Sequence, residues 1–191
     1  MSYDPASAEA QRGAAAETAA AALIQRRGGV VLPVYSSVAN GDDKAPLVLL
    51  PDGTAAVGPD ILCWLNHRGY WIDVKGKTVP TWRRNDPGPR WEHGIDLANF
   101  CDYERVGAET GVPVWLLVHE DRSPLDALAE SAFVPPGGWL AIALAEARRL
   151  GEHRKDWPGG AQAPARRGRR QEGGWLWARK DMRVWCPGTA E

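Results

Sequence analysis

The chain has 191 residues, of which 44% are hydrophobic and 25% charged, and its formal net charge is −1. This composition is ordinary for a soluble globular protein, and the length suits one domain with a proper core. The three cysteines stand far apart in no metal-ligand spacing, so neither a disulfide framework nor a structural zinc site is expected. Since no signal segment and no apolar run of membrane length occur, we expect a cytoplasmic protein that does not contact membranes.

Basic residues concentrate towards the C-terminus. Between Arg148 and Trp185, eleven basic residues stand against four acidic ones, so this part carries +7 and the rest of the chain −8. The split favours a polyanionic partner, although a solvated basic tail gives the same pattern. Several of the ten tryptophans stand beside arginines or Gly-Pro segments, as in surfaces on which nucleic-acid bases stack. Packing in a core or at its rim is the commoner role of tryptophan in proteins.

The first predicted element is a helix that begins at Asp4-Pro5, with Asp as N-cap and Pro at the first helical position, and runs to Arg27. The pair Gly28-Gly29 ends it. Small residues share one face of this helix, which favours close packing on a sheet. Glu17 falls on the same stripe, where it is either a functional carboxylate or a residue at the edge of the packed face.

Residues 30–35 form an expected edge strand marked by Pro33, and residues 46–50 a further strand. Residues 60–77 then predict two strands joined by the polar turn Asn66-His67-Arg68-Gly69. Asp60 begins the first of these two strands, and Asp73 and Lys75 project from one face of the second because strand side chains alternate. A carboxylate and an amine inside an apolar strand are costly to bury unless they have a partner or a purpose.

The segment 79–91, VPTWRRNDPGPRW, is predicted to be a loop. Its three arginines and two tryptophans make it a candidate nucleic-acid contact: Trp82, Arg83, Arg84, Arg90 and Trp91.

A helix is expected over 94–110, followed by a continuous apolar run over 112–118 that is typical of a buried strand. Strand, helix and strand in this order form a parallel crossover, which makes the predicted fold α/β. Residues 139–150 predict another amphipathic helix, residues 159–174 a mobile basic loop, and residues 175–185 a last short strand.

Three carboxylates and a lysine can meet on this fold: Asp60 and Asp73 from neighbouring strands, Glu17 from the first helix, and Lys75. Carboxylate oxygens suit Mg²⁺ or Mn²⁺, which also bind substrate phosphate. The metal polarises a phosphoryl oxygen, and the lysine orients or deprotonates a water and stabilises developing charge. This chemistry matches phosphodiester hydrolysis.

Gly58-Pro59-Asp60, followed after twelve residues by Asp73-Val74-Lys75, resembles the PD-(D/E)xK nuclease superfamily, which has the restriction-endonuclease-like fold. Gly13 and Glu17 on the first helix, Tyr103 on the later helix and Gly111-Val112-Pro113-Val114 resemble its Holliday-junction-resolvase-like and RecB-like branches. The resemblance covers about residues 8–120. The Gln motif of some RecB-like members and the cysteine cluster of the iron–sulfur branch are missing, which leaves the branch open.

The resemblance implies a central mixed β-sheet flanked by α-helices. We expect a nuclease-like core over 1–147 and a basic, Trp-rich extension over 148–191 packed on the same domain. The resemblance implies metal-dependent cleavage of nucleic acid, and our leading hypothesis is an endonuclease or resolvase that acts on DNA, depends on Mg²⁺ or Mn²⁺, and is phage-like or mobile-element-like in its small size. Asp60, Asp73 and the Val74 backbone carbonyl would be metal ligands, Lys75 the catalytic lysine, and Glu17 a further ligand or a water-orienting carboxylate. The DNA contacts expected from the basic segments are Lys77, Trp82, Arg83, Arg84, Arg90, Arg166, Arg167, Arg169 and Arg170.

Simpler interpretations remain open for each site residue. Asp73 and Lys75 also fit an ion pair on an exposed strand face, and Asp60 fits a Pro-Asp turn. For the whole chain the alternatives are a catalytically inactive nucleic-acid-binding protein on the same fold and an interaction module whose Trp-rich surface binds protein. A homodimer is one arrangement that supplies the two active sites needed to resolve a junction or cut both strands.

Overall fold

The computed structural model describes residues 8–33, 47–77, 80–83, 90–120, 138–155 and 173–186. Its elements in chain order are α1 (Ala8–Arg26), β1 (Val30–Pro33), β2 (Leu47–Leu49), β3 (Ala55–Val57), β4 (Ile61–Leu65), β5 (Arg68–Lys77), β6 (Thr81–Arg83), β7 (Arg90–Asp96), α2 (Leu97–Thr110), β8 (Val114–Glu120), β9 (Trp139–Ala143), α4 (Leu144–Leu150), β10 (Glu152–Arg154), β11 (Gly174–Ala178), the short 3-10 helix η1 (Arg179–Asp181) and β12 (Arg183–Cys186).

The main sheet has the strand order β1-β4-β5-β8-β9-β12 among the described residues. Only the central pair β5–β8 is parallel, and the other neighbours are antiparallel, so the sheet is mixed. Parallel neighbours need a crossover connection, and the chain between β5 and β8 supplies one that contains α2. The predicted α/β class, a mixed sheet flanked by helices, is confirmed, and Pro33 lies on an edge strand as expected.

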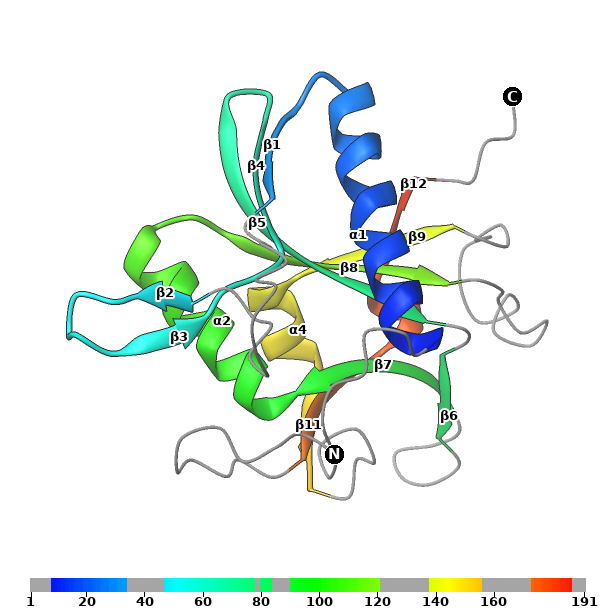
Figure 1. Cartoon of the computed structure of the whole chain (residues 1–191). Helices are drawn as coiled ribbons and strands as arrows, with labels where there is room; N and C mark the ends of the chain where they lie inside the picture. The colour runs from blue at the N-terminus through cyan, green and yellow to red at the C-terminus, as the bar shows by residue number, and fades with distance from the viewer. Residues whose placement is uncertain are drawn as a thin grey trace.

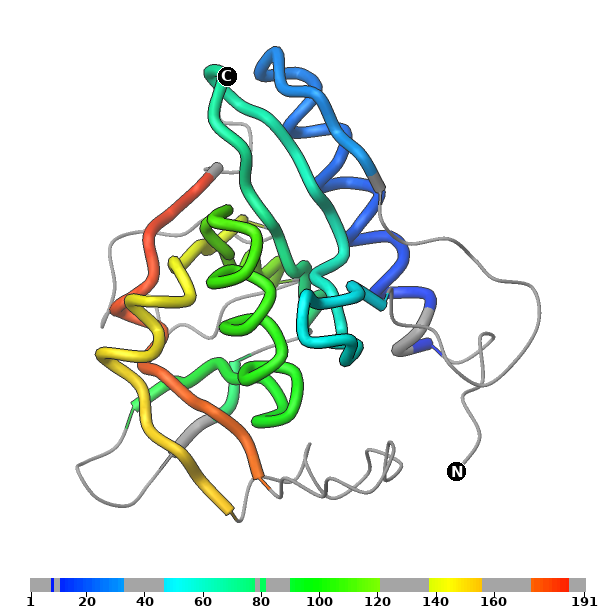
Figure 2. The backbone as a smooth tube through the Cα atoms, turned by 90° about the vertical axis from the view of Figure 1, so that its left-hand side faces the viewer, coloured from blue at the N-terminus to red at the C-terminus, as the bar shows by residue number. Residues whose placement is uncertain are grey.

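Helices cover both faces of this sheet (Figure 1). α1 packs on one face through Ala16, Ala20 and Ile24, which share a buried cluster with Ile72 and Val74 of β5. On the other face, Phe100, Tyr103 and Val106 of α2 share a second cluster with Trp71 of β5 and with α4. The β4–β5 hairpin therefore runs between α1 and α2 (Figure 2).

The hairpin turn is fixed by local backbone geometry. Asn66 and His67 both have positive φ, 51° and 63°. Two consecutive residues of positive φ match the twist of the flanking strands in a two-residue hairpin loop, and Asn is among the residues that tolerate this conformation. The predicted pair of strands is confirmed, with Leu65 pairing with Arg68 directly across the turn.

A second sheet has the order β10-β11-β7-β6, and β2 pairs with β3 in a separate hairpin. This second sheet corrects two predictions. Residues 94–96 belong to β7 and not to the expected helix, because they pair with β11. Gly94 suits this strand, since a Cβ there would lie 2.8 Å from the Trp175 carbonyl oxygen. The predicted loop over 79–91 contains β6 and the start of β7, which pair at Trp82 and Trp91.

Two further expectations differ near the C-terminus. The helix predicted over 139–150 begins only at Leu144, because residues 139–143 form β9, buried between β8 and β12. A short apolar run does not distinguish a buried strand from a buried helix. Residues 175–185 form parts of two strands, β11 in the second sheet and β12 at the edge of the main sheet, separated by η1.

Strands after residue 147 thus belong to both sheets, while the division into a core over 1–147 and an extension over 148–191 stays a prediction. The expected helix start at Asp4-Pro5 and residues 159–172 of the predicted basic loop lie outside the described residues, and the last residue of that loop, Gly174, begins β11. Within the described ranges, no helix has the length and apolarity needed to cross a membrane.

Candidate functional site

The candidate site lies where β4 leaves the edge of β5. β4 pairs with β5 only as far as Ile61 and Ile72, whereas β8 continues along the other edge of β5 to Lys77. Asp60 stands immediately before β4, and its Oδ2 accepts a 2.7 Å hydrogen bond from the Val74 amide. The Asp60 side chain therefore extends the pairing of β5 by one hydrogen bond after the β4 backbone has turned away.

Asp73 and Lys75 project from the face of β5 that α2 covers. Asp73 is fully buried, and its Oδ1 accepts a 2.7 Å hydrogen bond from Lys75 Nζ and a 2.6 Å hydrogen bond from the Tyr103 hydroxyl. The other carboxylate oxygen, Oδ2, is buried and has no hydrogen-bond partner among the described residues. A buried oxygen without a partner is costly, and such atoms in folded proteins call for an explanation.

The charge of Asp73 lies close enough to Asp60 to affect the ionisation of Asp60. Burial, and then the charge of Asp73, raises the pKa of Asp60 to about 7, while Lys75 opposes this shift. Burial alone would lower the pKa of Lys75, but Asp73, Asp60 and Glu17 raise it above its ordinary value. The lysine is therefore an ammonium that partly offsets an excess of negative charge.

Glu17 reaches the same region from α1. Gly76 of β5 permits this close approach, since a Cβ there would lie 2.9 Å from the Arg12 carbonyl oxygen of α1. Burial raises the pKa of Glu17, Lys75 lowers it, and Asp73 raises it again. Glu17 thus lies within electrostatic range of the site and is half-buried, whereas no hydrogen bond joins it to Asp60, Asp73 or Lys75 in the described residues.

The predicted nucleic-acid contacts are only partly described. Lys77 follows Lys75 on the same face of β5, and Trp82 and Arg83 lie on β6, where only the backbone is described. Arg90 donates from Nε to Glu92 at 2.7 Å and from Nη2 to Glu152 at 3.3 Å, so its guanidinium is engaged inside the second sheet. The remaining predicted contacts lie outside the described residues: Arg84, Arg166, Arg167, Arg169 and Arg170.

The sequence did not predict the role of Tyr103. The sequence named it only as part of the resemblance over the later helix. It is buried on α2, and its hydroxyl reaches Asp73. Burial, and then the charges of Asp73 and Asp60, raises the pKa of Tyr103 well above its ordinary value, so the phenol remains a donor. The available signal was the phenolic group itself, because a buried Tyr usually needs a polar partner.

Asp96, at the junction of β7 and α2, was also missed because the expected helix began at Gly94. It occupies the N-cap position of α2 but makes no side-chain capping bond, and its Oδ1 is buried without a partner among the described residues. Burial raises its pKa, and Lys75 and Lys77 oppose that shift. An acidic residue at a helix start was the sequence signal for this position.

A buried ionic cluster adjoins the C-terminal end of β5. Glu120 of β8 pairs in register with Lys77, and its two oxygens accept 2.8 Å hydrogen bonds from Nε and Nη2 of Arg179. Nε2 of His93 lies 2.6 Å from Glu120 Oε1. Burial lowers the pKa of His93, and Glu120 opposes this shift. The cluster joins β7, β8 and η1 and so ties the two sheets together beside the candidate site.

The carboxylates of the candidate site can be compared with the ligands that a divalent metal ion requires. Within the described part of the chain, no group of three or more His, Cys, Asp or Glu side chains is arranged to hold a metal ion. Two carboxylates do converge, however, and Mg²⁺ is usually held by one or two carboxylates with waters and substrate phosphates. The unpartnered Asp73 Oδ2 and the raised pKa of Asp60 both suit a cation between these groups. The donor set therefore fits a hard divalent ion.

No protein-family model matches this chain, and no curated protein matches its sequence. Among solved structures, the fold is similar to that of Archaeoglobus fulgidus Hjc, a Holliday junction resolvase from an archaeal hyperthermophile. The TM-score is 0.44 and the identity 11%, over 85% of this chain and 86% of the resolvase. A likeness at this level does not establish an activity, so the functional assignment depends on the geometry of the site.

Proposed function

We propose that the chain is a metal-dependent nuclease that hydrolyses phosphodiester bonds in DNA. The observation that carries the proposal is the meeting of two carboxylates and an ammonium at one edge of β5. Asp60 is fixed by the Val74 amide at 2.7 Å, and Asp73 by Lys75 at 2.7 Å, with Asp73 Oδ2 left unpartnered among the described residues. Asp73 is completely buried, whereas it would be accessible to solvent if Asp73 and Lys75 formed only an ion pair on an exposed strand face.

Each residue has a specific role in this proposal. Asp60 and Asp73 hold Mg²⁺ or Mn²⁺, together with the Val74 carbonyl, which points to the Asp60 side of β5 because the N–H and C=O of a strand residue point the same way. A bound divalent ion supplies Lewis-acid polarisation of the phosphate and stabilises the leaving oxygen. Lys75 places positive charge where negative charge develops on the phosphate. Glu17 orients the attacking water.

The direct test is cleavage of a panel of duplex, branched and single-stranded DNA substrates with Mg²⁺ or Mn²⁺. We expect activity that a chelator removes and that Asp73→Ala and Lys75→Ala each abolish. Cleavage that does not need metal, or full activity in both variants, would contradict the proposal. Salt-sensitive DNA binding without metal binding in calorimetry would favour the alternative of an inactive nucleic-acid-binding protein.

The proposed DNA contacts are the basic and aromatic residues that the sequence predicted for this role. Lys77, Trp82, Arg83, Arg84, Arg90, Arg166, Arg167, Arg169 and Arg170 are proposed contacts. Substitution of a phosphate-contacting lysine or arginine should weaken binding about equally for all sequences and reduce the salt slope by roughly 1.

A homodimer is the arrangement we propose for cutting two strands. Its support is the outer strand β1, where Val30 and Leu32 are 65% and 53% exposed, and Trp64, directly opposite Val30, is 42% exposed. An exposed apolar edge strand is a ready template for pairing with another chain. Light scattering should give the mass of a dimer, and Leu32→Lys should shift it to a monomer; a monomeric wild-type protein would contradict this part of the proposal.

A further inference from the structure

The backbone that carries Asp60 is held by α2 from outside the candidate site. β3 ends at Val57, and only the buried pair Gly58-Pro59 separates it from Asp60. The Val57 amide donates a 3.0 Å hydrogen bond to Oδ2 of Asp102 on α2. Because Pro59 has a restricted φ and the link is short, fixing Val57 restricts where Asp60 can lie.

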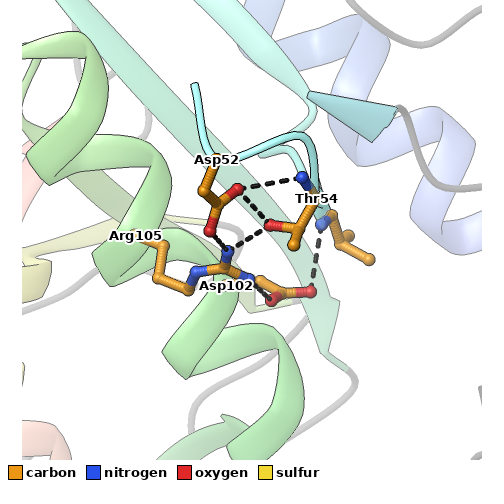
Figure 3. A network of polar contacts seen from close by, with 5 residues as sticks. Asp52, Thr54, Asp102 and Arg105 are labelled. Carbon is orange, nitrogen blue, oxygen red and sulfur yellow. Dashed lines mark hydrogen bonds and ion pairs between the residues drawn. The ribbon is translucent and has the colours of Figure 1, made fainter. Parts of the chain in front are cut away.

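A network of polar contacts extends this attachment to the turn that precedes β3 (Figure 3). Arg105, one helical turn after Asp102, donates from Nη2 to Thr54 Oγ1 at 2.5 Å and to Asp52 Oδ2 at 3.3 Å. Its Nη1 lies 3.9 Å from Asp102 Oδ1. Oδ1 of Asp52 in turn accepts from the Thr54 amide at 2.9 Å and from the Thr54 hydroxyl at 2.6 Å. Both ends of β3 are thus tied to one side of α2.

The same helix also holds the other aspartate. Tyr103, the neighbour of Asp102 in the chain, donates to Asp73 Oδ1 at 2.6 Å. Two consecutive residues of α2 therefore act on the two carboxylates of the site, Tyr103 directly on Asp73 and Asp102 through the Val57 amide on the segment of Asp60. A shift of α2 relative to β3 would change the separation of the two aspartates.

We propose that Asp102 and Arg105 are positioning residues, which set the place of Asp60 relative to Asp73 by fixing β3 to α2. This inference rests on the proposed nuclease function, because it assigns the two residues to the alignment of the metal-binding carboxylates. Neither residue belongs to the motifs that predicted the site.

The contribution of this network to stability is expected to be small. The side chains of Arg105, Asp102 and Asp52 are 36%, 27% and 59% exposed, and exposed ion pairs add little to the free energy of unfolding. Ala56 and Val57 are in any case held by the buried cluster that includes Phe100 and Val106 of α2. The precise placement of a ligand residue is more sensitive, since loss of an outer partner typically weakens metal affinity or activity 10- to 100-fold.

The experiment compares Asp102→Ala and Asp102→Asn with Glu104→Ala in the full chain. Glu104 is a matched control, because it is a partly exposed carboxylate on α2 that pairs with Arg148 of α4 at 3.4 Å instead of with the β3 segment. For each protein we would measure Mn²⁺ affinity by calorimetry, the Mn²⁺ concentration for half-maximal DNA cleavage, and the Tm. We expect Asp102→Ala to weaken Mn²⁺ binding about 10-fold, with cleavage restored by excess Mn²⁺. Asp102→Asn should recover most of the affinity, because its amide oxygen still accepts the Val57 N–H.

Failures of the two proposals are distinguishable. If the wild-type protein binds and cleaves normally but Asp102→Ala matches Glu104→Ala in Mn²⁺ affinity, the positioning role is wrong and the nuclease proposal stands. If the wild-type protein neither binds Mn²⁺ nor cleaves DNA, the function fails and the positioning role with it. Should Asp102→Ala unfold, Arg105→Ala replaces it, since this variant keeps the acceptor for Val57; unchanged Mn²⁺ affinity in that folded variant would overturn the inference.

Discussion

The Tyr103 hydroxyl donates a 2.6 Å hydrogen bond to Oδ1 of Asp73, the oxygen that also accepts from Lys75 at 2.7 Å. Both donors therefore act on one oxygen of a fully buried carboxylate, and Oδ2 is left without a partner among the described residues. This arrangement orients the carboxylate. It also explains how Asp73 tolerates burial, and it leaves Oδ2 available for the proposed metal ion.

Tyr103→Phe should reduce both stability and metal affinity. The variant removes a hydrogen bond to a charged group, which is worth about 1.5–3 kcal/mol, and frees the Asp73 carboxylate to rotate. Urea unfolding measures the first effect and Mn²⁺ calorimetry the second. The control is Tyr70→Phe, because Tyr70 lies on β5, the strand of Asp73, but packs on the α1 face of the sheet. Equal metal affinity in the two variants would contradict an orienting role for Tyr103.

Lys75→Ala and Asp73→Asn should separate catalysis from metal binding. Both variants should lose DNA cleavage, but only Asp73→Asn should lose Mn²⁺ binding, because Lys75 supplies charge to the phosphate and not a ligand to the metal. Calorimetry and cleavage of the same DNA substrate give the two results. Lys180→Ala, an exposed lysine in η1, controls for the loss of one positive charge. If Lys75→Ala also lost Mn²⁺ binding, the two roles would not be separable.

The stability of the metal-free protein should fall as the pH rises through neutrality. The pKa of Asp60 is raised to about 7 from an ordinary 3.8, so the folded state holds a proton that the unfolded state releases. The resulting stabilisation is complete below the unfolded pKa and is lost as the pH passes the folded pKa. The raised pKa values of Glu17 and Asp96 act in the same direction.

The measurement is the free energy of unfolding of wild type and Asp60→Asn in chelator-treated buffer, from about pH 5 to about pH 8. The wild-type value should fall relative to that of the variant over this range. Added Mn²⁺ should remove the decline, because the ionised carboxylate then has a cation beside it. A constant difference between the two proteins across the range would contradict a raised pKa for Asp60.

Glu17→Gln tests the site residue that α1 contributes. If Glu17 orients water or contributes to metal binding, cleavage should fall roughly 10- to 100-fold while the Tm changes little. Glu109→Gln, at an exposed position near the end of α2, is the control. Unchanged cleavage would place Glu17 at the edge of the packed face of α1, the alternative that its position on the helix stripe allowed.

Sequence alone determined the features that depend on local chemistry. The polar turn that begins at Asn66 between two apolar segments predicted the β4–β5 hairpin, and the alternation of strand side chains placed Asp73 and Lys75 on one face. The crossover from β5 to β8 followed from a strand, a helix and an apolar run in order. These features need only neighbouring residues, so a pattern of residue types reveals them.

Tertiary structure decided the features that depend on distant pairing. Residues 94–96 and 139–143 are strands because β11, β8 and β12 offer partners, although their residues also suit helices. The hydrogen bond from Tyr103 to Asp73 and the attachment of Val57 to Asp102 join residues 30 and 45 positions apart. No local preference encodes such contacts, because they form only when α2 packs against β3 and β5. The sequence therefore predicted which side chains could carry the chemistry, and the packing of α2 determined how two of them are held.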